Sequence, residues 1–258
     1  MINDIKNRFP FSAFTLKMVA LITMVIDHFG MYAYSYALID DPTNDILRQI
    51  GRISFVLFAF TVAESFVHTS NKEKYLSRLL LFGIGIEVVY YLINIAMGYQ
   101  DSGVGINIFI TLFLGALTCY LFELKGWKKL LFLFPLLFIV FTPKYIEYGF
   151  YGVGMIFLFY LFKDSSFWKV VALVIWNFLC LNVMPPLFIH LQEIFTYVPT
   201  NGLMPANMLI YQQLSILAIP FILLYNGKRG YASKFMKWFF YFFYPLHLAL
   251  LQIIFWLI

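Results

Sequence analysis

Long apolar segments alternate with short polar ones along almost the whole chain. A helix needs about 20 apolar residues to cross a bilayer, so nine of these segments are predicted to be membrane spans. Their expected bounds are 14 to 37, 50 to 67, 76 to 97, 105 to 123, 128 to 142, 147 to 162, 168 to 184, 207 to 225 and 238 to 258. The fifth and sixth are short for this purpose, and a re-entrant pair is the alternative for them. The pattern predicts an all-α, polytopic transmembrane helical bundle.

Composition agrees with a membrane protein that consists of one domain. Hydrophobic residues make up 62% of the chain and charged residues 12%, far from the averages of soluble domains. The predicted spans and their short loops use the full length, so a single integral-membrane domain over residues 1–258 is expected. The polar start MINDIKNR leads directly into the first span without a small-residue cleavage site, so no cleavable signal peptide is expected.

The basic residues alternate between successive loops, which predicts the orientation in the membrane. The loops expected in the cytoplasm carry Lys6, Arg8, Lys72, Lys74, Arg78, Lys125, Lys128, Lys129, Lys163, Lys169, Lys228, Arg229, Lys234 and Lys237. The opposite loops carry Asp40, Asp41, Asp45, Asp101, Glu147 and Glu193, with Lys144 as the clearest basic exception. The positive-inside rule then predicts a cytoplasmic N-terminus in the cell membrane. This loop bias also accounts for the net charge of +5 without a nucleic-acid partner.

Charged residues interrupt the first apolar segment, LKMVALITMVIDHFGM, at both ends. Lys17 and His28 fall within about 20° of each other on one helical face, roughly 16 Å apart along the axis. Ionisable residues inside a span indicate function, although a snorkelling lysine and a packing histidine are the plainer alternatives. Asp27 projects about 100° away from His28. It is expected to pair with a basic residue on another helix, for instance Arg52, whose own alternative is a headgroup contact.

Other predicted spans carry polar residues towards their interior. Glu64 lies in the inner half of the second span, and Glu87 lies near the middle of the third. Asn107 begins the fourth span, where it is favoured as a site residue. Tyr244 and His247 lie one turn apart in the last span. We expect these side chains to line the interior of the bundle.

Small and hydroxyl residues, and two further histidines, are weaker candidates. Thr111, Gly115 and Thr118 form a stripe that is typical of tight helix packing. His68 and His190 are expected at the surface. Cys119 and Cys180 lie within apolar runs, so neither a disulfide nor a metal site is predicted.

Two functions fit a bundle with such an interior. A transmembrane acyltransferase needs a cationic inner mouth for the phosphates of coenzyme A, a polar channel, and a base beside the thioester. A proton-coupled small-molecule transporter would instead use Glu64, Glu87 and the histidines as a relay. There is no HExxH, GxSxG or phosphate-cradling glycine motif, and no inverted repeat for a transporter.

The spacing K-x10-H over Lys17 to His28 resembles the (R/K)-x10-H motif of the membrane type 3 acyltransferases. More of the chain resembles the TraX family, named for the conjugative pilin acetylase. The similar stretches are LKMVALITMVIDHFG, GRISFVLFAFTVAESFVHTSNKEKYLSRLLLFG, NIFITLFLGAL, EYGFYGV, LLYNGKRG and FYPLHLALL. The resemblance implies a helical membrane architecture and acetylation of an amine on a processed pilin subunit. It also implies a polar core of Lys17, Asp27, His28, Arg52, Glu64, Glu87, Asn107, Glu147, Tyr244 and His247.

The resulting hypothesis is transfer of an acetyl group from cytoplasmic acetyl-CoA, without a metal, to a peptide or glycan acceptor outside. His28 is the predicted general base, with Asp27 and Arg52 as the other catalytic candidates. Lys17, Glu64, Glu87 and Asn107 are the candidates for binding acetyl-CoA, and Tyr244 and His247 for binding the acceptor. Either Arg52 or Asn107 is expected to stabilise the oxyanion. Direct transfer and an acetyl-histidine intermediate are both compatible with these residues.

Overall fold

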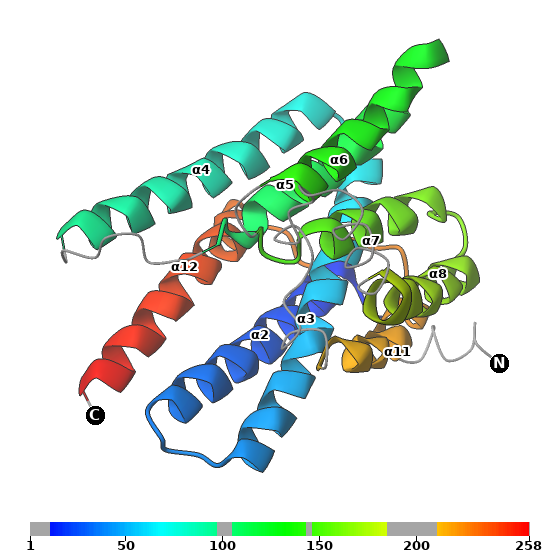
Figure 1. Ribbon diagram of the computed structural model, residues 1–258. Helices are drawn as coiled ribbons and strands as arrows, with labels where there is room; N and C mark the ends of the chain where they lie inside the picture. The colour runs from blue at the N-terminus through cyan, green and yellow to red at the C-terminus, as the bar shows by residue number, and fades with distance from the viewer. Residues whose placement is uncertain (1–10, 97–104, 143–145, 185–210, 258) are drawn as a thin grey trace, which may run out of the picture. The chain divides into compact units, whose positions relative to one another are not determined.

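The computed structural model describes residues 11–96, 105–142, 146–184 and 211–257, and its regular elements are helices (Figure 1). The long helices are α2 (Ala13–Ser35), α3 (Asp41–His68), α4 (Lys72–Ala96) and α12 (Lys234–Leu257). The shorter elements are α5 (Ile108–Phe122), η1 (Gly126–Phe132), α6 (Leu133–Phe141), α7 (Gly149–Leu161), α8 (Ser166–Phe178), η2 (Leu179–Val183), η4 (Gln213–Ala218) and α11 (Ile219–Leu223). Within the described residues there is no β-strand, only two isolated β-bridges. The all-α prediction is confirmed.

Five helices are long and apolar enough to cross a membrane by length and composition. They are Ala13–Ser35, Asp41–His68, Lys72–Ile93, Ser166–Val183 and Lys234–Leu257, and they match the first, second, third, seventh and ninth predicted spans. The fourth, sixth and eighth predicted spans hold shorter apolar helices. The fifth is split between the 3₁₀ turns of η1 and the nine-residue α6. Residues 207–210 of the eighth lie outside the described residues.

Helix α3 begins at Asp41, nine residues before its predicted start. The Asp40 side chain accepts a hydrogen bond from the Thr43 backbone N–H at 3.1 Å, as an N-cap does. Pro42 fits in the first turn, where a helix needs no N–H donor. Hydrogen bonds from Thr43 also lower the pKa of the Asp40 carboxyl. The hydropathy pattern did not include residues 41–49 in the predicted span because most of them are polar, although they belong to the same helix as the apolar residues that follow.

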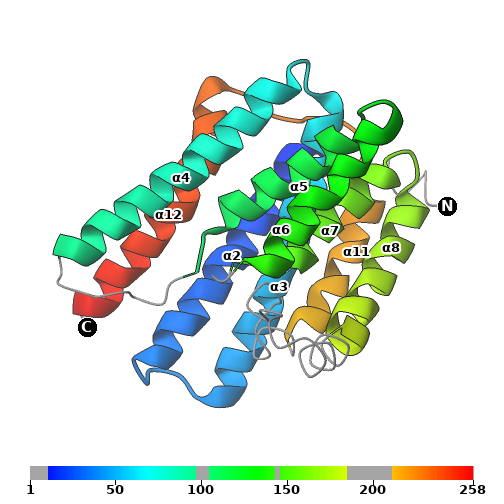
Figure 2. The same ribbon diagram turned by 45° about the horizontal axis from the view of Figure 1, so that its top comes forward.

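The chain divides into two compact units, residues 1–61 with 210–258, and residues 62–209. In the first unit, α2 packs against α12 and against residues 41–61 of α3. Figure 2 shows α2 with α12 on one side of it and α3 on the other. A Cβ atom added at Gly30 would lie 2.8 Å from Leu47, so α2 and α3 approach closely there. Ala33 of α2 is buried against Leu251 and Phe255 of α12.

The second unit is built around α5, which contacts α4, η1, α6 and α7. Its apolar core includes Leu114 of α5, Ile139 of α6 and Val153 of α7, all buried. A Cβ atom added at Gly115 would lie 2.5 Å from the Ile156 side chain, so α5 and α7 meet closely. Thr118 is buried and donates to the Leu114 carbonyl in its own helix. The prediction that this stripe serves helix packing is confirmed.

Candidate functional site

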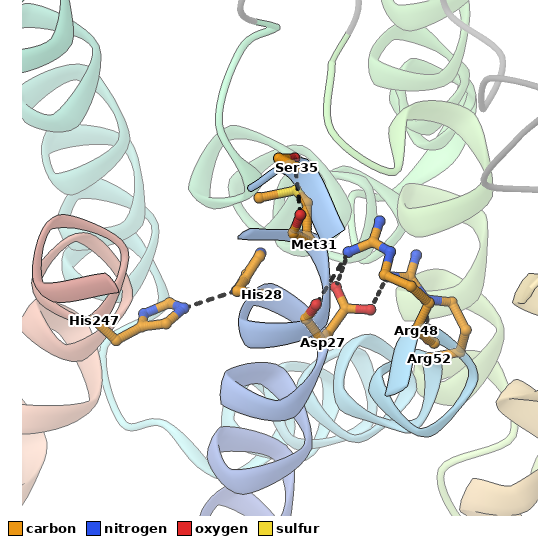
Figure 3. A network of polar contacts seen from close by, with 7 residues as sticks. All are labelled: Asp27, His28, Met31, Ser35, Arg48, Arg52 and His247. Carbon is orange, nitrogen blue, oxygen red and sulfur yellow. Dashed lines mark hydrogen bonds and ion pairs between the residues drawn. The ribbon is translucent and has the colours of Figure 1, made fainter. Parts of the chain in front are cut away.

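Asp27 and His28 are neighbours on α2 and point to different helices. Successive helical residues project about 100° apart. Figure 3 shows Asp27 directed towards α3 and His28 towards α12. Each side chain therefore has its own partners, and the two do not form a dyad.

Two arginines of α3 hold the Asp27 carboxylate. Arg52 donates from Nη2 to Oδ1 at 2.5 Å, and Arg48 donates from Nη1 to Oδ2 at 2.8 Å (Figure 3). Arg52 also donates from Nε to the Arg48 carbonyl at 3.1 Å, which fixes its guanidinium along the helix. The predicted pairing of Asp27 with Arg52 is confirmed. Its second partner, Arg48, was missed because it lay in a predicted loop.

The Asp27–Arg48–Arg52 cluster is buried and carries an excess of positive charge. Asp27 is 6% exposed and Arg52 1% exposed, and two guanidiniums face one carboxylate. A Cβ atom at Gly51 would lie 2.2 Å from the Asp27 Cβ, so only glycine at this position lets α3 come close enough. The geometry gives Asp27 a structural role and directs Arg52 towards Asp27.

His28 meets His247 of α12. The His28 Nδ1 and His247 Nε2 atoms are 2.8 Å apart, and the ring centroids are 4.9 Å apart (Figure 3). The other ring nitrogen of His247, Nδ1, lies 2.9 Å from the Phe243 carbonyl oxygen. Tyr244 is buried next to His247, with ring centroids 6.0 Å apart. The structure thus makes His247, which was predicted to bind the acceptor, a direct partner of the predicted base.

Cationic residues gather at the beginning of α2. The Ala13 and Phe14 N–H groups donate to the Lys228 and Arg229 carbonyls, which brings that basic turn to the helix start. Lys17 follows within one turn, and its Nζ lies 5.4 Å from the centroid of the Phe240 ring. Lys17 therefore lies one turn from the start of α2, and His28 lies eleven residues further along the helix.

In the second unit, Glu64 forms an ion pair with Lys169 of α8 at 2.6 Å. The two side chains are 12% and 6% exposed. Lys169 was predicted to lie at the cytoplasmic surface, and that placement is wrong because α8 begins at Ser166 and turns this lysine inward. The pair gives Glu64 a neutralising partner, and its predicted part in donor binding stays a prediction.

Glu87 and Asn107 join α4 to the beginning of α5. The Asn107 Oδ1 accepts from the Phe109 N–H, while its Nδ2 donates to Glu87 at 2.6 Å and to the Gly83 carbonyl at 2.9 Å. Glu147 accepts from the Ile108 N–H at 3.1 Å, so two carboxylates face this helix N-terminus. Both atoms of the Asn107 amide are used within the protein, and no donor is left over for an oxyanion. This arrangement gives no support to the predicted roles of Asn107 in binding acetyl-CoA and in stabilising the oxyanion.

Six of the predicted site residues lie in the first unit and three lie in the second. The first group is Lys17, Asp27, His28, Arg52, Tyr244 and His247, and the second is Glu64, Glu87 and Asn107. His68 bonds the Glu64 carbonyl in its own helix, and His190 lies outside the described residues. In the part of the chain that the structure describes, no group of three or more histidine, cysteine, aspartate or glutamate residues could hold a metal.

Arg48, the partnership of Lys169 with Glu64 and the His28–His247 contact were not predicted from the sequence. Arg48 precedes Arg52 by four residues, so a helix starting at Asp41 would have placed both on one face. The histidine contact joins residues 219 positions apart, for which helical periodicity holds no signal.

Comparison with known proteins finds one family and two relatives. The model of the TraX protein family matches residues 12–255. A "Probable fimbrial assembly protein FimC, serogroup H1" of Dichelobacter nodosus is 31% identical over 252 residues, covering 93% of this chain and 94% of that protein. An uncharacterized protein of Rickettsia prowazekii (strain Madrid E) is 30% identical over 111 residues, covering 43% of this chain and 37% of that protein. No solved structure matches significantly.

Proposed function

Because the chain belongs to the TraX family, we propose that it is a membrane-embedded acetyltransferase. It moves an acetyl group from cytoplasmic acetyl-CoA to an amine or hydroxyl acceptor on the outer side of the membrane. The observation that carries the proposal is the contact between His28 and His247, which holds a half-buried imidazole eleven residues along α2 from Lys17. A base separated along the helix from a cation is what transfer across a membrane requires.

The cations at the beginning of α2 fit the phosphates of acetyl-CoA. Lys17 lies one turn after the helix start, against which the backbone of Lys228 and Arg229 is bound, and ammonium and guanidinium groups are the usual partners of phosphate. Lys17 and His28 are separated by roughly 16 Å along the helix axis, so a donor bound at the cations must extend towards His28. When bound, acetyl-CoA supplies the activated thioester.

His28 acts on the acceptor. Its imidazole takes a proton from the attacking amine or hydroxyl, whose nitrogen or oxygen forms the new bond to the acetyl carbonyl carbon. The carbon–sulfur bond then breaks, and the thiolate that leaves takes the proton from His28. The products are the acetylated acceptor and coenzyme A with a free thiol, and His28 returns to its neutral form. Arg52 is bound to Asp27 on the α3 side of α2, so its predicted part in stabilising the oxyanion stays a prediction.

A pilin-like or fimbrial subunit is the acceptor we propose. The relative from Dichelobacter nodosus is named for fimbrial assembly, and it matches this chain along nearly its full length. A peptide acceptor presents an amine at its N-terminus, while a glycan hydroxyl is the second choice. Both present a proton that His28 can remove.

The membrane arrangement that goes with this function has nine spans and a cytoplasmic N-terminus. Five helices already have the length and apolarity of spans, and the alternation of basic and acidic loops supports the orientation. A single domain is supported by the family match, which runs through both compact units.

The contacts favour an enzyme over a proton-coupled transporter. A relay needs intramembrane acids that can gain and lose a proton. Glu64 is bound to Lys169, and Glu87 accepts two hydrogen bonds from Asn107. Both carboxylates are therefore already engaged by side chains that join helices of the protein, which favours a structural use over a relay.

The test compares surface peptides and glycans of a parent strain and a strain lacking this protein by intact mass. The deletion should remove the mass of one acetyl group from a single class of molecules. Wild-type protein and His68→Ala should restore it, since His68 only bonds its own helix, and His28→Ala should not. Restoration by His28→Ala at normal protein levels would refute the assignment of the base, and an unchanged acetylation pattern in the deletion strain would refute the proposed function.

A further inference from the structure

We propose that His247 is a positioning residue that fixes the tautomer of His28, so that His28 presents an unprotonated Nε2 to the acceptor. The use of that nitrogen as a base rests on the proposed function. The tautomer itself rests on the hydrogen bonds alone.

A chain of two hydrogen bonds determines where the protons lie. The Phe243 carbonyl oxygen can only accept, so the His247 Nδ1 atom, 2.9 Å away, must carry a hydrogen. In a neutral imidazole the second nitrogen is then an acceptor, which makes His247 Nε2 unprotonated. His28 Nδ1, 2.8 Å from that acceptor, must therefore be the donor. The lone pair of neutral His28 is left on Nε2.

The packing around His247 holds its ring in this orientation. The ring is 6% exposed and stacks on Phe243, with centroids 5.3 Å apart and an interplanar angle of 12°. Tyr244 contacts it edge-on. Rotation of the ring would break both the stack and the bond to the Phe243 carbonyl, so the tautomer of His247 is transmitted to His28.

Asp27 cannot take over this function. Its two carboxylate oxygens bind Arg52 and Arg48, and it leaves α2 in another direction (Figure 3). A carboxylate is the familiar partner that orients a catalytic histidine. Here the partner is a neutral imidazole, which orients His28 without adding negative charge. When His28 Nε2 takes a proton, its Nδ1–H can be shared with His247, so the positive charge spreads over two rings.

The first experiment reads the protonation of the ring nitrogens directly. The chain has four histidines, so nitrogen-15 NMR of histidine-labelled, purified protein is tractable, with single His→Gln variants for assignment. We expect a protonated Nδ1 and an unprotonated Nε2 on both His28 and His247 in the wild type. In His247→Leu, His28 should become a mixture of tautomers. A wild-type His28 that is protonated on Nε2 alone would overturn the proposal.

The second experiment separates positioning from binding. In His247→Gln, the side-chain oxygen can reach the place of Nε2 and accept from His28, whereas His247→Leu offers no acceptor. For acetyl transfer we expect His247→Leu to lower kcat by about 10²-fold or more, within the range that a positioned base contributes, with KM for acetyl-CoA unchanged. The kcat of His247→Gln should be at least about tenfold higher than that of His247→Leu. His68→Gln is the matched control and should equal the wild type.

The two outcomes are independent of each other. If wild-type protein transfers no acetyl group to any acceptor, the proposed function fails, and the NMR spectrum still decides the tautomer. If transfer occurs but the leucine and glutamine variants are equally slow, or if only KM changes, His247 does not position His28 through a hydrogen bond.

Discussion

The Asp27 carboxylate of α2 lies 2.5 Å from the Arg52 guanidinium of α3, and both side chains are buried. Burying two charges costs solvation, and their attraction repays it only when the geometry is good and further hydrogen bonds are made. Arg48 supplies one of these, and the bond from Arg52 Nε to the Arg48 carbonyl supplies another. The pair therefore specifies how the first two long helices meet.

Replacing Asp27 should destabilise the protein. Asp27→Asn would leave the buried Arg52 guanidinium and the partly buried Arg48 guanidinium without a counter-charge, and we expect a loss of about 3–5 kcal/mol in the free energy of unfolding. Equilibrium unfolding in detergent measures it. Asp41→Asn, at an exposed position in the first turn of α3, is the control and should change stability by less than about 0.5 kcal/mol. Equal losses in the two variants would contradict a structural role for the Asp27 cluster.

A methyl group at Gly51 should act through Asp27. Because its Cβ would overlap Asp27, we expect Gly51→Ala to cost about 1–3 kcal/mol as α2 and α3 are pushed apart. Gly85→Ala is the matched control, since nothing lies within 4 Å of a Cβ atom there and alanine is the better helix former. It should stabilise the protein, by up to about 1 kcal/mol. The thermal midpoints of the two variants should move in opposite directions, and a shared direction would count against the close approach.

The ion pair between Glu64 and Lys169 permits a double-mutant test. Glu64→Leu alone should cost about 3–5 kcal/mol, because it leaves a buried ammonium without its carboxylate. Adding Lys169→Met should restore most of the loss, since an apolar pair of similar volume is often neutral. If the double variant is stable yet binds acetyl-CoA more weakly than the wild type, Glu64 or Lys169 also takes part in donor binding.

Asn107→Ala should weaken the junction between α4 and α5. The variant loses the N-cap of α5, worth about 1 kcal/mol, and the two bonds that Nδ2 makes to Glu87 and Gly83. We expect a total loss of about 2–3 kcal/mol by chemical unfolding. Asn182→Ala, an exposed control, should change stability by less than about 0.5 kcal/mol. Unaltered stability with a raised KM for acetyl-CoA would instead assign Asn107 to donor binding.

Lys17→Met should weaken donor binding through the phosphates. Hydrogen bonds to charged groups contribute about 1.5–3 kcal/mol, so the Kd for acetyl-CoA should rise roughly tenfold to a hundredfold by calorimetry. Acetyl-pantetheine, which lacks the nucleotide phosphates, should bind the variant as it binds the wild type. Lys74→Met, an exposed lysine in the other unit, is the control. A variant that binds both donors normally would exclude Lys17 from the donor site.

Helix type and rough position followed from hydrophobicity, while helix boundaries did not. The apolar length of α2 and α12 is visible in the sequence, and both were predicted within a few residues. The first turns of α3 were missed because Asp40, Pro42 and Thr43 begin a helix through capping, which hydropathy does not measure.

An ion pair could be predicted from the sequence only where few residues of opposite charge were expected at the same depth in the membrane. Asp27, buried and pointing away from His28, needed a cation from another helix, and Arg52 was the candidate at a similar depth. Lys169 was assigned to a loop, so its bond to Glu64 could not be foreseen. Such pairs depend on how helices pack, and packing is set by side chains far apart in the sequence.

The sequence by itself determined the all-α membrane class and the placement of Lys17 and His28 on one helix, because these depend on composition and on helical periodicity. It also determined the family, through the resemblance of stretches along the chain. Only the tertiary structure decided which nitrogen of His28 carries the proton. That choice depends on His247 and on the Phe243 carbonyl, brought to α2 by the packing of α12. A hydrogen bond forms only when donor and acceptor atoms lie about 3 Å apart. Residues near the two ends of the chain come that close only in the folded protein.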